Sequence, residues 1–154
     1  MLNKNFNMVL NSLTFHNSQA TLKTISGADG SFSQSAFMPN SSWKGGADFQ
    51  TSDGLALVIS TETFNEDVDN FALPTCFTDY SDVQLAKADA SNEVALCYTR
   101  IITPNSDVVI KSIALVVNWS QSSGVFALLG FENLAEPVQL TAGEQHTFTF
   151  TIKV

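Results

Sequence analysis

Charged side chains are scarce in this sequence. Of its 154 residues, 14% are Asp, Glu, Lys or Arg, whereas about a quarter is usual in globular domains. The 15 acidic residues outnumber the 7 basic ones, which gives a net charge of −8, and the basic residues form no run. Because contacts with phosphate groups require clustered Lys and Arg, we expect no nucleic-acid partner. The polar surface must consist mostly of Ser, Thr, Asn and Gln, and such a surface often lies against other protein.

Long apolar runs are also absent. Nowhere do the roughly 18 consecutive apolar residues occur that a membrane-spanning helix needs. The first residues, MLNKNFNMVLNSLTF, do not resemble a signal peptide, because Asn5, Asn7 and Asn11 interrupt the apolar stretch and no small-residue cleavage site follows. We therefore expect no association with a membrane, and synthesis and folding in a cytoplasm.

Residues that bind metals are few and badly spaced. The two cysteines, Cys76 and Cys97, form no pair of metal-ligand spacing with each other or with a histidine. We interpret them as small buried hydrophobic residues, and a disulfide between them would require an oxidising compartment. The acidic stretch ETFNEDVDN, residues 62–70, lacks the spacing and the glycine of a calcium-binding loop. We interpret this stretch as a solvated turn, and we predict no metal site.

No motif for catalysis or for binding a cofactor occurs in the sequence. It contains no G-x-S-x-G, no H-E-x-x-H and no glycine-rich phosphate loop. The segment TDYSD, residues 78–82, holds two carboxylates, but two carboxylates on one loop are typical of a hydrated surface rather than of a catalytic cleft. We therefore predict that the protein is not an enzyme and uses no cofactor.

Alternation of apolar and polar residues is the main signal that is present. From His146 onward, Phe148, Phe150 and Ile152 share one side with His146, and threonines occupy the other side, which is typical of a half-buried strand. The continuous apolar run at residues 55–61 predicts a strand covered on both faces. Further strands are predicted at residues 6–13, 20–26, 93–103, 107–119, 125–132 and 134–140.

These strands, separated by turn residues, predict one all-β domain over residues 1–154. We expect a single antiparallel β-sandwich of the Ig-like or jelly-roll type, with about seven to nine strands and little helix. Pro137 places the stretch at 134–140 on an edge or at the start of a strand. A loop-rich insertion is predicted around residues 31–53, a stretch that is rich in Ser, Gly and Asn and that consists of a long loop or of short strands with wide turns.

Aromatic residues supply the candidate contact sites. Apolar side chains in the loop-rich insertion need cover that a partner subunit could provide, and the predicted interface consists of Phe32, Phe37, Met38 and Trp43. An alternative is that aromatic rings stack on sugars, as in sandwich-type carbohydrate-binding modules. The candidate sugar contacts are Trp43, Tyr80 and Trp119.

The second half of the sequence, residues 73–154, resembles a carboxy-terminal module that recurs in structural proteins of tailed bacteriophages and prophages. The module has an Asp-Tyr segment, then a strand that follows an N-x-S sequence, and an ending of the type L-x-x-P-V-x-L-x-x-G-E-x-x-T-x-T. The matching residues are Thr78, Asp79 and Tyr80; Asn105, Ser106, Ile110 and Ile113; and Leu128, Leu129, Leu134, Pro137, Val138, Leu140, Gly143, Glu144, Thr147, Thr149 and Ile152. The sequence departs from the module at residues 112–115, SIAL in place of E-I-G-L, and at residues 130–132, where GFE replaces an Arg.

The resemblance implies a non-enzymatic virion protein. Its role would be that of a head decoration, neck or tail component, made in the cytoplasm of the bacterial host and located in the virion. The implied partners are other virion proteins and copies of the chain itself. The resemblance implies no active site, and the alternative function remains a carbohydrate-binding or host-adhesion module.

Overall fold

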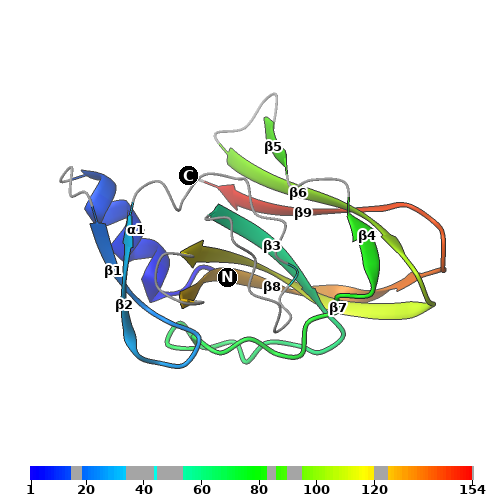
Figure 1. Cartoon of the computed structure of the whole chain (residues 1–154), viewed down its shortest axis with the longest axis horizontal. Coiled ribbons are helices and arrows are strands. Elements are labelled where there is room, and N and C mark those ends of the chain that lie inside the picture. The colour runs from blue at the N-terminus through cyan, green and yellow to red at the C-terminus, as the bar shows by residue number, and fades with distance from the viewer. Residues whose placement is uncertain are drawn as a thin grey trace.

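The computed structural model describes residues 1–14, 19–33, 44, 54–82, 86–89, 95–119 and 125–153. Within these ranges the helix α1 (Lys4–Thr14) precedes a series of strands (Figure 1). The strands are β1 (Gln19–Lys23), β2 (Asp29–Ser33), β3 (Gly54–Ser60), β4 (Tyr80–Asp82), β5 (Ala86–Asp89), β6 (Ala95–Pro104), β7 (Val108–Trp119), β8 (Val125–Leu140) and β9 (His146–Lys153). No helix in these ranges is long and apolar enough to cross a membrane.

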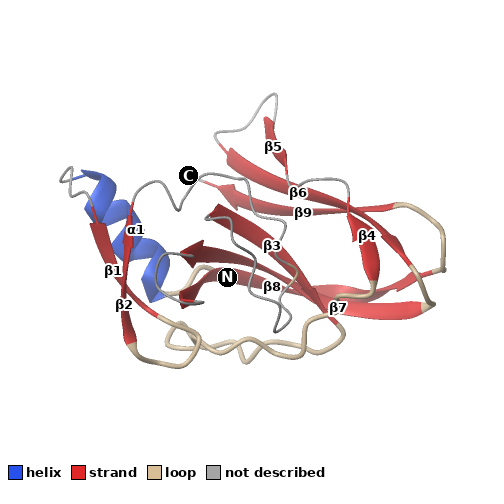
Figure 2. Ribbon diagram, in the orientation of Figure 1, coloured by secondary structure: helices blue, strands red, loops and turns tan. Residues whose placement is uncertain are grey.

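The strands form two main antiparallel sheets. One sheet has the order β3–β7–β8, and in the other β6 pairs with β9 on one side and with the short strands β4 and β5 on the other. The hairpin β1–β2 and helix α1 lie at one end of the molecule, and the turn between β6 and β7 lies at the opposite end (Figure 2). The prediction of a mostly β, antiparallel, sandwich-like fold is confirmed.

The sheet β3–β7–β8 is covered on both faces. In β3, Leu55, Leu57 and Ile59 belong to the apolar cluster between the two sheets, whereas Ala56 and Val58 belong to a second cluster on the opposite face. The segment that follows β3 covers this second face, where the rings of Phe64 and Phe131 stack at 4.7 Å between centroids. The prediction that residues 55–61 form a strand buried on both sides is therefore confirmed for β3.

Strand β9 also follows its prediction. Phe148, Phe150 and Ile152 are buried, and the threonines between them are exposed. The ring of Phe150 packs against β8 at Gly130, where an added Cβ would lie 3.0 Å from the Phe150 Cζ atom and 2.9 Å from Leu2 Cδ2. A glycine at this position therefore lets β9 lie closely over β8.

The first segment of the chain corrects the prediction. Residues 6–13 were expected as a strand, and no helix of ten residues was expected, but α1 spans 11 residues. Asn5, Val9 and Ser12 share one face of the helix and are buried, which is the spacing of a helical stripe rather than of a strand. Asn3 caps this helix, because its side-chain oxygen accepts a hydrogen bond of 3.0 Å from the Asn5 N–H.

Two asparagines, Asn3 and Asn5, attach the helix to the strands β1 and β8. The Asn5 amide donates to the carbonyls of Lys23 (2.7 Å) and Leu128 (2.9 Å) and accepts from the Lys23 N–H at 2.7 Å. The Asn3 amide donates to the Leu128 carbonyl at 2.7 Å. These bonds tie α1 to both β1 and β8.

Two further boundaries differ from the predictions. Residues 31–33, at the start of the predicted insertion, belong to the short strand β2, which pairs with β1, and most of the rest of the insertion lies outside the described residues. The stretches at 125–132 and 134–140 form one strand, β8. The register with β7 shifts between the pairs Ile110–Val138 and Ser112–Asn133, and Pro137 lies within this irregularity. Because Pro137 has no pairing partner on β7, its missing N–H removes no hydrogen bond between the strands.

We predict that Asn5→Ala lowers the free energy of unfolding by roughly 2–3 kcal/mol, because it leaves buried backbone groups of Lys23 without their partner. Urea unfolding followed by circular dichroism measures this loss. The matched control is Asn7→Ala, at an exposed position of the same helix, which should change stability by less than about 0.5 kcal/mol. Equal losses in the two variants would contradict the role given to Asn5.

Candidate functional site

The largest completely buried side chain of the described residues is Arg100, on β6. It shares the inner side of β6 with Ile102 and faces the sheet β3–β7–β8. Its guanidinium donates a hydrogen bond of 2.6 Å to the Leu57 carbonyl of β3 and lies 3.3 Å from the Asp82 carboxylate. Because β3 is an edge strand, no neighbouring strand supplies a donor for the Leu57 carbonyl, and Arg100 provides that donor.

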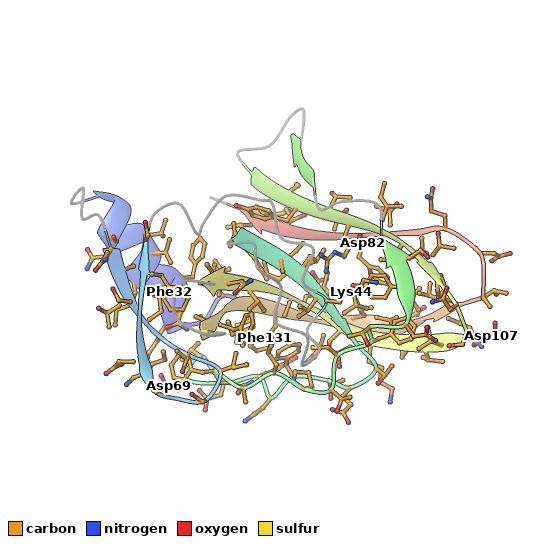
Figure 3. The ribbon with its side chains drawn as sticks, in the orientation of Figure 1. Phe32, Lys44, Asp69, Asp82, Asp107 and Phe131 are labelled. Atoms are coloured by element: carbon orange, nitrogen blue, oxygen red, sulfur yellow. The ribbon has the colours of Figure 1, made fainter. Side chains whose placement is uncertain are left out.

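Tyr80 completes this buried polar cluster. Its hydroxyl oxygen accepts a hydrogen bond of 3.3 Å from Arg100, and its side chain is 2% exposed. Lys44 donates to the Tyr80 carbonyl, and its ammonium group lies 4.3 Å from the centre of the Tyr80 ring, in the geometry of a cation–π contact. Figure 3 labels Lys44 and Asp82, which lie close to the short strand β4. We name the group Arg100, Asp82, Tyr80 and Lys44 the inter-sheet cluster.

The electrostatics of the inter-sheet cluster favour a structural role. The pKa of Tyr80 is raised from 10.0 to about 12, mainly because the phenol is buried; Arg100 acts to lower this pKa and the Asp82 carboxylate acts to raise it. The phenol therefore stays protonated at neutral pH and cannot act as a base. The Asp82 carboxylate is 12% exposed and pairs with the fully buried guanidinium of Arg100, so both charges of this pair serve to hold the two strands together.

A second polar cluster joins three turns at the far end of the sandwich. The Asp79 carboxylate accepts hydrogen bonds from Asn105 Nδ2 at 2.8 Å and from Ser106 Oγ at 3.2 Å. The Asp107 carboxylate, labelled in Figure 3, accepts from the Ala142 N–H at 2.9 Å. The turn between β6 and β7 is thus tied to the segment before β4 and to the turn between β8 and β9. We name Asp79, Asn105, Ser106 and Asp107 the corner cluster.

The carboxylates of residues 62–69 serve as local hydrogen-bond acceptors. Glu62 accepts from the Thr75 N–H at 3.0 Å, Glu66 from Asn133 at 3.1 Å, and Asp67 from the Asp69 N–H at 2.9 Å. Asp69 pairs with Lys4 at 2.5 Å. Among the residues described, no group of three or more potential ligands is placed to hold a metal ion.

The two cysteines are not bonded to each other. Cys76 is partly buried, and burial together with the Glu62 carboxylate raises the pKa of its thiol to about 11. This thiol is therefore protonated at neutral pH and is a poor nucleophile. Cys97 is buried on β6, with its sulfur 3.6 Å from Thr151 Oγ1.

A hollow of about 210 Å³ lies in the segment after β3. Its lining contains no ionisable side chain, so it offers none of the convergent charged groups that fix the orientation of a polar ligand. The lining residues are Thr63, Phe64, Asn65, Asn70, Ala72, Leu73 and Pro74.

The structure corrects the expectations for three side chains. Phe32, expected at an interface, is 0% exposed and packs in the core beside the β1–β2 hairpin (Figure 3). Tyr80, expected as a sugar contact, has no exposed ring face. Asp82, expected on a hydrated surface, pairs with Arg100. Each of these residues lies in a stretch rich in turn residues, which suggested an exposed side chain. In the structure each occupies an inward-facing position on a short strand, and this position buries the side chain.

The other candidate contacts lie outside the described residues. These are Phe37, Met38 and Trp43, together with the side chain of Trp119, whose backbone ends β7. Sequence reasoning missed Arg100. A signal was present, because Tyr98, Arg100 and Ile102 share the apolar side of their strand. A charged residue on that side needs a buried partner.

The raised pKa of Tyr80 predicts a loss of stability in alkali. A tyrosine whose folded pKa exceeds its unfolded value stabilises the fold fully below pH 10, and this contribution disappears as the pH rises to about 12. The difference corresponds to roughly 3 kcal/mol. Urea unfolding across this pH range should show the decline, and Tyr80→Phe should flatten it. An equal decline in the variant would contradict the assignment.

The comparisons with known proteins give no relative. No family model, no curated protein and no solved structure matches this chain.

Proposed function

We propose that this protein is a non-enzymatic structural component of a bacteriophage virion, and that it assembles through contacts with other virion proteins and with copies of itself. Its place would be in the head, neck or tail of the particle, after synthesis in the host cytoplasm. The proposal starts from the resemblance of residues 73–154 to the phage module.

The observation that carries the proposal is the role of the residues behind that resemblance. Asn105 and Ser106 both donate hydrogen bonds to the Asp79 carboxylate in the corner cluster, and Tyr80 belongs to the inter-sheet cluster. Thr147 and Thr149 lie on the exposed side of β9, whose other side is buried. These residues join turns and sheets, so their chemistry is that of a framework, which supports a role in which the surface of the protein is its function.

The surface of the β6–β9 sheet also supports a role in assembly. Its outer side carries threonines that pair across the strands, with Thr99 Oγ1 and Thr149 Oγ1 3.3 Å apart. A hydroxyl-bearing surface loses less solvation energy on contact with protein than a charged surface does. The same sheet holds β9, which has one charged residue, Lys153.

The alternative function, a carbohydrate-binding module, gains no support from the described residues. It requires aromatic rings that are exposed for stacking, and Tyr80 is buried with Lys44 over its ring. Its other two candidates, Trp43 and the side chain of Trp119, lie outside the described residues.

Mass spectrometry of purified particles tests the proposal. The particles come from the bacterial culture that carries this gene and are purified by density gradient. We predict that peptides of this chain co-purify with the particles in a fixed ratio to the other virion proteins. A sample in which the other virion proteins are present and this chain is absent would contradict the proposal.

A further inference from the structure

The two edges of the sheet β3–β7–β8 are protected against pairing with another chain. The edge of β3 is covered where its Leu57 and Ile59 carbonyls accept hydrogen bonds from Arg100 and from the Phe77 N–H. The edge of β8 pairs with residues 1–3 through Leu129 and Phe131. The remaining part of β8 carries Glu132, Glu136 and Pro137. Proline, charge and covering segments are the usual means by which proteins block edge pairing.

Strand β9 lacks these protections. It is eight residues long, contains no proline and no acidic residue, and pairs with β6 alone among the residues described. The strands on the opposite side of β6 are shorter, at three residues for β4 and four for β5. An extended edge of this length and composition is a template for the addition of another strand.

We infer that β9 pairs in antiparallel orientation with β9 of a second copy of this chain, so that the two β6–β9 sheets join across a twofold axis at Thr149. The inference rests on the proposed assembly role and specifies how the copies meet. In this register, Thr147 lies opposite Thr151 of the second copy, and Phe148 lies opposite Phe150. Directly opposed residues of an antiparallel pair lie on the same side of the sheet, so the threonine side and the buried side each continue across the axis.

Self-complementarity and charge favour a second copy as the occupant. The row formed by Thr99 and Thr149 would extend to Thr149 and Thr99 of the second copy, and threonine pairs across strands are stabilising. The strand brings no acidic side chain to the axis, although the whole chain has a net charge of −8.

A charge-swap experiment on the purified protein tests this pairing. Sedimentation velocity over a concentration series should show a monomer–dimer equilibrium for the wild type. In Thr149→Lys two ammonium groups meet at the axis, so dimerisation should weaken by about tenfold or more. Thr149→Glu should behave in the same way. An equimolar mixture of the two variants should dimerise again, because opposite charges then meet.

The matched control is Thr21→Lys, which places the same charge at an exposed strand position outside this sheet. It should dimerise as the wild type does. As a second measurement, Thr149→Cys should form an intermolecular disulfide in the presence of a mild oxidant, whereas Thr21→Cys should not. This measurement decides the matter if a charged variant fails to fold.

Three results would overturn the pairing: a wild type that is monomeric at every concentration, a dimer that is unaffected in Thr149→Lys, or a mixture of the charged variants that stays monomeric. These results are distinct from a failure of the proposed function. A chain that occurs in particles but is monomeric in solution refutes the β9 pairing alone. A chain that dimerises through β9 but is absent from particles refutes the virion proposal alone.

Discussion

The burial of Arg100 is the constraint on which the arrangement of the two sheets depends. A guanidinium stays charged in proteins, and it can be withdrawn from water only where acceptors surround it. Here the acceptors come from the Leu57 carbonyl of β3 and from Tyr80 and Asp82 of β4. These acceptors reach the terminal nitrogens of the guanidinium only when β6 lies across the edge of β3 with β4 beside it. Apolar packing between the sheets has no such directional requirement, so we assign the position of one sheet over the other to this cluster.

Several polar side chains of the described residues build the framework. Asn5 joins α1 to β1 and β8, and Asp79 joins the segment before β4 to the turn between β6 and β7. Each links segments that are distant in the sequence through hydrogen bonds to backbone or amide groups, and none lies in a cleft with a nucleophile. This distribution agrees with the proposed role in assembly, for which the β9 edge is, among the described residues, the proposed contact with a neighbour.

Local patterns determined which parts of this fold could be predicted. The alternation in β9 and the apolar run of β3 have a period of two and were interpreted correctly. The strand predicted at residues 6–13 is part of the helix α1, whose start is determined by the cap at Asn3 and whose attachment is determined by the buried Asn5. The inter-sheet cluster was missed because its members lie at residues 44, 80, 82 and 100. No local pattern reports which distant carboxylate will meet a buried arginine.

A double-mutant cycle between Arg100 and Asp82 tests the central claim most directly. Arg100→Met and Asp82→Asn should each lower the free energy of unfolding by roughly 3–5 kcal/mol, because each leaves the other partner buried without its counter-charge. If Asp82 on β4 holds the buried guanidinium that reaches across to β3, the double variant should be more stable than the sum of the single losses predicts, by about 2 kcal/mol or more. Losses that add to within about 0.5 kcal/mol would show that the two residues act independently, and would contradict the account.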